Sequence, residues 1–82
     1  MRRGKLRKPA ALLAPRLRQI AALAARGLLD KEIAYELGLA PGTVKVCLHF
    51  VYERLNIKTG NQRVKLAIYW LEHGDLRLNN YE

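Results

Sequence analysis

A three-residue link between two helix-forming segments is the feature that most constrains the fold of this chain. Residues 38–40 (Gly-Leu-Ala) join a segment predicted to be helical over 30–37 to another predicted over 41–55. Two helices joined so closely must cross at a steep angle, as they do in a helix-turn-helix unit. Gly38 suits the turn because it has no side chain and adopts a left-handed conformation without strain. The link therefore predicts a helix-turn-helix unit over residues 30–55.

The side chains around the link meet the packing demands of that unit. Ala34 is small and stands where the two helices approach each other, and Val44 stands where it can fill the angle between them. The rest of the local core is expected to be formed by Ile33, Leu37, Leu39 and Leu48. Each of these features is common alone, but the ordered set is fairly specific for a helix-turn-helix unit.

Apolar residues at helical spacing predict two further helices, over 15–26 and from about 61 to 73. The apolar face of the second of these is expected to consist of Val64, Ala67, Ile68 and Leu71. The prediction is an all-α domain over residues 10–74. It is a four-helix helix-turn-helix domain, like the winged-helix superfamily but without a wing.

Charge points to a polyanionic partner. Fifteen Lys and Arg residues against seven Asp and Glu residues give a net charge of +8, which suits binding to nucleic acid or to an anionic membrane face. Residues 1–9 hold five of these bases and no acid, and are predicted to be a flexible basic arm. Whether the arm contacts phosphates or is only a solvated tail stays open. Residues 75–82 are expected to be a short tail.

Several residue types that other function classes need are missing. The chain has no serine, and its single cysteine, Cys47, is expected to be a half-buried structural thiol rather than a redox switch. With His49 and His73 far apart, no metal-ligand cluster is expected. We therefore predict that the chain is not an enzyme and needs no cofactor. A lone cysteine, together with the lack of a long apolar segment, predicts a cytoplasmic protein with no membrane span.

Several segments follow the pattern of one known family. They are Ala-Ala-Arg-Gly-Leu at 24–28, Lys-Glu-Ile-Ala-Tyr-Glu-Leu-Gly at 31–38, Pro-Gly-Thr-Val-Lys-Val at 41–46, Tyr-Glu-Arg-Leu at 52–55, and Val64 with Ala67. The stretch from about 12 to 73 thereby resembles the LuxR/GerE-type DNA-binding domain of bacterial transcription regulators. The run from 41 to 46 is its most diagnostic part.

The resemblance implies a function and a set of contact residues. It implies a small transcription regulator that binds double-stranded DNA sequence-specifically, with the helix over 41–55 in the major groove. The positions that read bases fall on Lys45, Val46 and His49. Lysine can donate to guanine O6 and N7, and valine can contact a thymine methyl group. Contacts with phosphates are expected from Lys31, Thr43, Arg54 and Lys58, which lie at the ends or flanks of helices.

The last predicted helix, from about 61 to 73, is a candidate surface for binding protein partners. In the family this helix often pairs two domains, so Tyr69 and Trp70 are candidates for a homodimer surface. The alternative is that Trp70 covers the core of its own domain. Two other function classes stay open. One is a module like region four of sigma factors, which also binds RNA polymerase, and the other is a protein-interaction module that sequesters another regulator.

The chain departs from the family at the starts of its first three helices. Ala14, Leu29 and Ala40 stand where the family usually has a capping serine or threonine. Each missing cap costs about 0.5–2 kcal/mol, so a domain less stable than its relatives is expected. Asp30 is a candidate substitute cap for the helix over 30–37.

Two more departures concern surface positions. Phe50 stands where a polar residue is usual, and contact with a sugar, with a protein partner or with the basic arm all stay open. Gly60 replaces a frequent basic residue, and Arg63 and Lys65 are expected to compensate for the lost phosphate contact.

Overall fold

Four helices form the part of the chain that the structure, a computed structural model, describes. It describes residues 13–73, so the predicted arm over 1–9 and the tail over 75–82 lie outside it. The helices are α2 (Pro15–Ala25), α3 (Asp30–Leu37), α4 (Pro41–Arg54) and α5 (Gln62–His73). Residues 13–73 include no strand, which confirms the all-α fold class without a wing.

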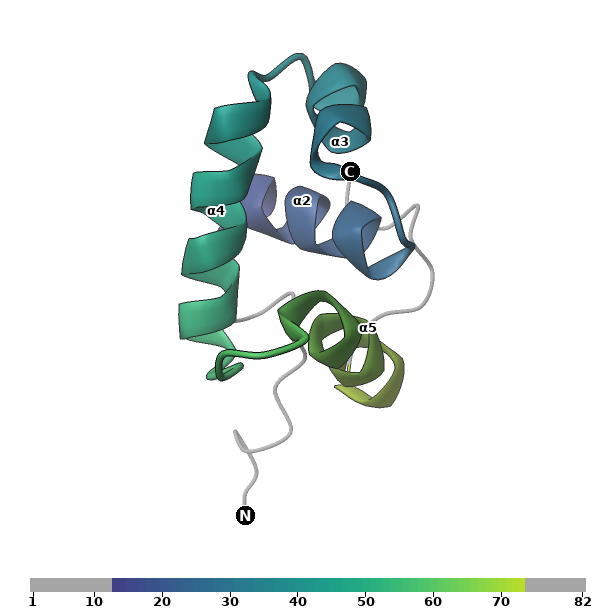
Figure 1. The fold of residues 1–82 in the computed structure, drawn as a ribbon, viewed down its shortest axis with the longest axis vertical. Coiled ribbons are helices and arrows are strands. Elements are labelled where there is room, and N and C mark those ends of the chain that lie inside the picture. The colour runs from purple at the N-terminus through teal and green to yellow at the C-terminus, as the bar shows by residue number, and fades with distance from the viewer. Residues whose placement is uncertain (1–12, 74–82) are drawn as a thin grey trace.

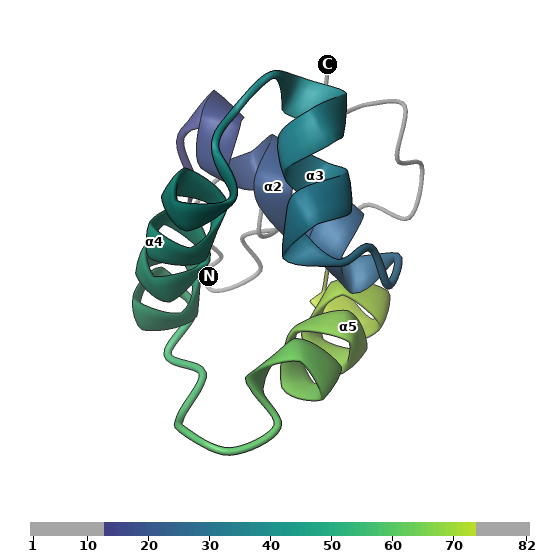
Figure 2. The ribbon, with the colours of Figure 1, turned by 45° about the horizontal axis from the view of Figure 1, so that its top comes forward.

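Helix α2 is the centre of the arrangement. It packs against α3, α4 and α5, while α3 packs on α4 (Figures 1 and 2). Its five consecutive residues from Ile20 to Ala24 are all buried. Three of the five are alanines, whose short side chains let neighbouring helices approach α2 on more than one side. This central position leaves α4 along one edge of the described part of the chain, with one long side that no other described helix covers (Figure 1).

The predicted turn between α3 and α4 is confirmed. Gly38 has a φ of 68°, and the N–H of Leu39 donates to the carbonyl oxygen of Ala34 at 2.8 Å. Asn56 closes α4 in the same way, with a φ of 59° and a bond of 2.8 Å from the N–H of Ile57 to the oxygen of Tyr52. Asparagine tolerates this left-handed conformation better than most residues. Both helices therefore end where the left-handed residue forces them to.

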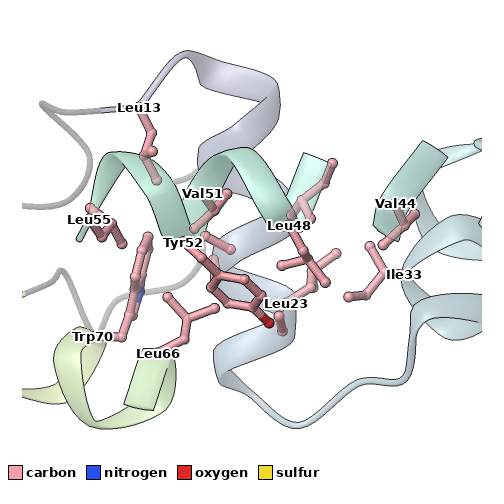
Figure 3. Close-up of a cluster of buried hydrophobic side chains, with 14 of the residues drawn as sticks. Leu13, Leu23, Ile33, Val44, Leu48, Val51, Tyr52, Leu55, Leu66 and Trp70 are labelled. Atoms are coloured by element: carbon pink, nitrogen blue, oxygen red, sulfur yellow. The ribbon is translucent and has the colours of Figure 1, made fainter. Parts of the chain in front are cut away.

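The core of the helix-turn-helix unit also matches the prediction. Ile33 and Val44 are completely buried and face each other across the angle between α3 and α4 (Figure 3). Ala34 is 3% exposed at the same contact, where a larger side chain would hold the helices apart. Leu37 and Leu39 are half-buried against this core rather than inside it.

The predicted apolar face of α5 is wrong. Val64, Ile68 and Leu71 are 57%, 48% and 65% exposed, whereas Leu66 and Trp70 are 0% and 4% exposed. Two apolar rows run along this helix, and helical spacing alone does not show which of them is buried. The row with the bulky indole packs against the rest of the core, beside Leu55 (Figure 3).

The first three helices start without side-chain caps, as expected. Ala14, Leu29 and Ala40 are the N-cap residues, and none forms a side-chain capping bond. Asp30 is not the substitute cap, because it is the first residue inside α3 and binds Arg63. Instead, a carboxylate oxygen of Glu32 accepts a hydrogen bond of 2.7 Å from the N–H of Leu29. One of the orphan donors at this helix start is thereby satisfied.

Restoring a cap at α2 is expected to stabilise the domain. Ala14 is exposed and has the extended backbone that an N-cap serine needs, with φ −62° and ψ 156°. Ala14→Ser should raise the free energy of unfolding by about 0.5–2 kcal/mol, since its hydroxyl can accept from a free N–H. Thermal denaturation followed by circular dichroism measures the change, and Ala14→Val, which has no acceptor, serves as the control. Equal melting temperatures for the two variants would contradict the expectation.

Candidate nucleic-acid interface

The free side of α4 carries the three predicted base-reading residues. Val44 and Leu48 are buried in the core, whereas Lys45 and Val46 between them and His49 after them are exposed to solvent. Val46 is 55% exposed and the His49 side chain is 68% exposed. All three side chains are therefore available to a ligand along α4.

An acid lies beside the histidine. His49 Nε2 is 3.4 Å from a carboxylate oxygen of Glu53, one helical turn further along, and the Glu53 side chain is 63% exposed. An exposed pair of this kind adds little stability. Glu53 also sets a negative charge on the free side of α4, where the other charged side chains are basic.

Basic side chains from two helices meet at the start of α4. Lys31 and Lys45 line one open hollow together with Pro41 and Gly42. Lys45 also lines a second hollow with His49, which makes these two predicted base readers neighbours. Backbone N–H groups at a helix start add partial positive charge. The start of α4 therefore combines fixed charges and dipoles that suit an anion.

Further cations lie at the other end of α4. Arg54 is the last residue of the helix, and Lys58 follows in the loop; both are exposed. Lys58 lines a shallow hollow with Lys65, whose ammonium donates to the carbonyl oxygen of Thr59 at 3.3 Å. The eleven residue-to-residue steps from Thr43 to Arg54 span about 16 Å of helix. The four predicted phosphate-binding residues are thus exposed and bracket the predicted base readers.

Arg63, one of the two residues expected to compensate for Gly60, pairs with groups of its own domain. One guanidinium nitrogen lies 2.7 Å from a carboxylate oxygen of Asp30 and 3.1 Å from the carbonyl oxygen of Leu28. The pair is about one-third exposed, so it contributes little stability on its own. The pair joins the start of α5 to the start of α3. Asp30 lines both hollows beside Lys45, and Arg63 offsets its negative charge there. No local signal in the sequence marks this contact, because the partners are 33 residues apart.

Tyr52 lies beside this ion pair on the core side of α4. Burial raises the pKa of its phenol above the ordinary value of 10.0, while nearby Arg63 lowers the pKa and Asp30 raises it. The ring is 8% exposed and packs among the core side chains (Figure 3). Tyr52 is therefore a neutral core residue that helps to pack α4 against the rest of the domain.

The two aromatic residues considered for a dimer surface are not on the free side of α5. Trp70 is 4% exposed and fills the core of its own domain beside Leu66 (Figure 3). Tyr69 is half-buried and packs against the same core. The alternative in which Trp70 covers its own core fits this burial, and the exposed apolar row of α5 is instead formed by Val64, Ile68 and Leu71.

Metal-binding and membrane-spanning features are absent from the described part. Residues 13–73 contain no group of three or more side chains that could hold a metal ion. None of their helices is long and apolar enough to cross a membrane.

Comparison with known proteins gives one match. A family model described as GerE, bacterial regulatory proteins of the luxR family, matches residues 11–69. The matched range covers α2, α3 and α4 entirely and α5 up to Tyr69. No curated protein and no solved structure matches the chain significantly.

Proposed function

The chain belongs to the luxR family of bacterial regulatory proteins, and from this membership we propose that it binds double-stranded DNA sequence-specifically as a small transcription regulator. In this proposal α4 lies in the major groove. The observation that carries the proposal is the free side of α4, where Lys45, Val46 and His49 are exposed between basic residues at both helix ends. An α-helix fits the width of this groove in B-form DNA.

The three exposed residues offer three kinds of base contact. Lys45 can donate to guanine O6 and N7, and Val46 can contact the methyl group of thymine. His49 can donate or accept one turn further on, and a carboxylate oxygen of Glu53 lies 3.4 Å from its Nε2. The proposed site is therefore mixed, containing at least one guanine and one thymine.

Phosphate contacts would fix the register of α4 in the groove. Lys31 and Thr43 at its start and Arg54 and Lys58 at its end are exposed and can donate to phosphate oxygens. Each charged contact releases counterions, so binding should weaken with salt at a slope of about 0.9 per phosphate neutralised. These residues would supply affinity without sequence preference.

Selection from a random duplex library at two salt concentrations tests the proposal. The wild-type protein should enrich a defined site. Lys45→Ala and His49→Ala should each lose preference at one position, worth about 1–3 kcal/mol of discrimination, because a base contact is removed. Arg54→Ala is the matched control, since it should keep the preference and lower the salt slope by about one.

Three results would contradict DNA recognition by α4 or favour another function. Wild-type binding that is only non-specific, fades with salt and does not depend on Lys45 or His49 would remove the major-groove proposal. Binding to a second regulator that survives both substitutions would then favour the sequestering module. Capture of RNA polymerase subunits would favour the sigma-like module.

Pairing of two copies through α5 is part of the proposal. Val64, Ile68 and Leu71 follow one another at helical spacing, are 48–65% exposed, and form an apolar row away from the core. Apolar rows of this kind gain free energy when they are removed from water. A twofold dimer would place one row against its own copy and present two α4 helices to paired half-sites. The proposed place of action is the bacterial cytoplasm, where chromosomal DNA lies.

A further inference from the structure

Phe50 is the largest apolar side chain on the free side of α4. It is 48% exposed and lies one turn after Val46, which is 55% exposed. Residues four apart on a helix are neighbours, so the two side chains form a continuous apolar strip. The core side of α4, which holds Val44, Leu48 and Val51, is complete without Phe50. The exposed part of the ring therefore contributes nothing to the described fold.

Hydrogen-bond donors flank this strip. Thr43 lies seven residues before Phe50 and Arg54 four residues after it, so both stand on the same side of the helix. Both are exposed. Four residues correspond to about 6 Å along the helix axis, or roughly two base-pair steps of 3.4 Å. With α4 running along the groove, as the proposed function has it, Phe50 would lie within reach of bases next to a phosphate held by Arg54.

We propose that Phe50 is a specificity-determining residue that recognises the 5-methyl group of a pyrimidine in the major groove, next to a second methyl contact made by Val46. This inference rests on the proposed function. A phenyl ring has no hydrogen-bond donor or acceptor, and the C5-methyl group is the apolar feature of the major groove. The purine edges would leave polar groups facing the ring without water or a partner, which is costly, and unmethylated cytosine offers no methyl group there. The same chemistry occurs in thymine and in 5-methylcytosine.

Removing one methyl group at a time tests the inference. Each thymidine of the selected site is replaced in turn by deoxyuridine, which lacks only the 5-methyl group. The dissociation constant of the wild type should rise about fourfold at two positions, the effect of one buried methyl at each. Phe50→Asn should abolish the sensitivity at one of these positions, and Val46→Ala at the other.

Two further measurements separate the source of the methyl group and the role of the ring. At the position assigned to Phe50, a cytosine is compared with 5-methylcytosine, and tighter binding of the methylated base shows that either pyrimidine can supply the methyl group. Equal binding there assigns the contact to thymine. Phe50→Leu keeps an apolar side chain and should keep the sensitivity, and circular dichroism should show all three variants folded.

The outcomes that overturn the inference are distinct from failure of the proposed function. Equal sensitivity of wild type and Phe50→Asn to every uracil overturns the role of Phe50 while DNA recognition stands. Loss of self-association in Phe50→Asn with unchanged sensitivity makes the ring a protein contact and also overturns it. A wild type without any preferred site overturns both the inference and the proposed function.

Discussion

Trp70→Ala is expected to lower the free energy of unfolding by about 3–5 kcal/mol, the usual cost of emptying a buried tryptophan site. Trp70 is 4% exposed and packs beside Leu55 and Leu66 (Figure 3). Small domains have little stability to lose, about 5–15 kcal/mol in total. Urea denaturation followed by circular dichroism measures the change. The variant should be partly unfolded at 37 °C.

Trp70→Phe is the matched control. Among the described residues the indole N–H of Trp70 has no hydrogen-bond partner, so replacing the indole by a phenyl ring breaks no bond. This variant should retain most of the stability that Trp70→Ala loses, because an aromatic ring still fills the site. If Trp70→Ala unfolds like the wild type and only loses self-association, Trp70 is an interface residue and the packing of α5 described above is wrong.

The helix-turn-helix unit could be predicted because its determinants are local. Gly38 defines the turn because it adopts a positive φ without strain. Ala34 and Val44 define how α3 and α4 cross by the sizes of their side chains. All three lie within a stretch of eleven residues, and none has a competing role. The N-cap positions of the first three helices could be predicted for the same reason, since a cap is defined by its immediate neighbours.

The packing of α5 could not be predicted, since it depends on surfaces far away in the sequence. The helix has one apolar row with Leu66 and Trp70 and another with Val64, Ile68 and Leu71, and both have helical spacing. Which row is buried depends on the shape of the surface that α2, the main packing partner of α5, offers. A single sequence holds no direct measure of that shape.

The sequence predicts where the candidate site residues lie on α4, but it does not establish what they bind. The exposure of Lys45, Val46 and His49 follows from the buried stripe on the opposite side of α4, which helical periodicity predicts well. Their roles toward DNA stay predictions. The pairing of Arg63 with Asp30 was missed because a charged side chain in a sequence does not reveal whether its partner is a phosphate or a distant carboxylate.

Ile68→Gln is expected to weaken binding to a paired operator by about 10²–10⁴-fold, more than any single base contact, because it removes the coupling between two half-sites. Ile68 is 48% exposed in the middle of the apolar row of α5, between Val64 and Leu71. Burying a glutamine amide against a second copy leaves polar groups without partners, which opposes pairing. Glutamine is a good helix former and uncharged, so α5 and the electrostatic attraction to DNA should persist.

Sedimentation of the protein alone and titration of duplexes with one or two half-sites measure the two effects. Tyr35→Gln is the matched control, since Tyr35 is 86% exposed on α3 and the substitution is of the same kind. The control should self-associate and bind paired sites like the wild type. Ile68→Gln should be monomeric and bind a single half-site as the wild type does. Unchanged affinity for the paired operator would contradict pairing through α5, while reading by α4 would remain testable on the single half-site.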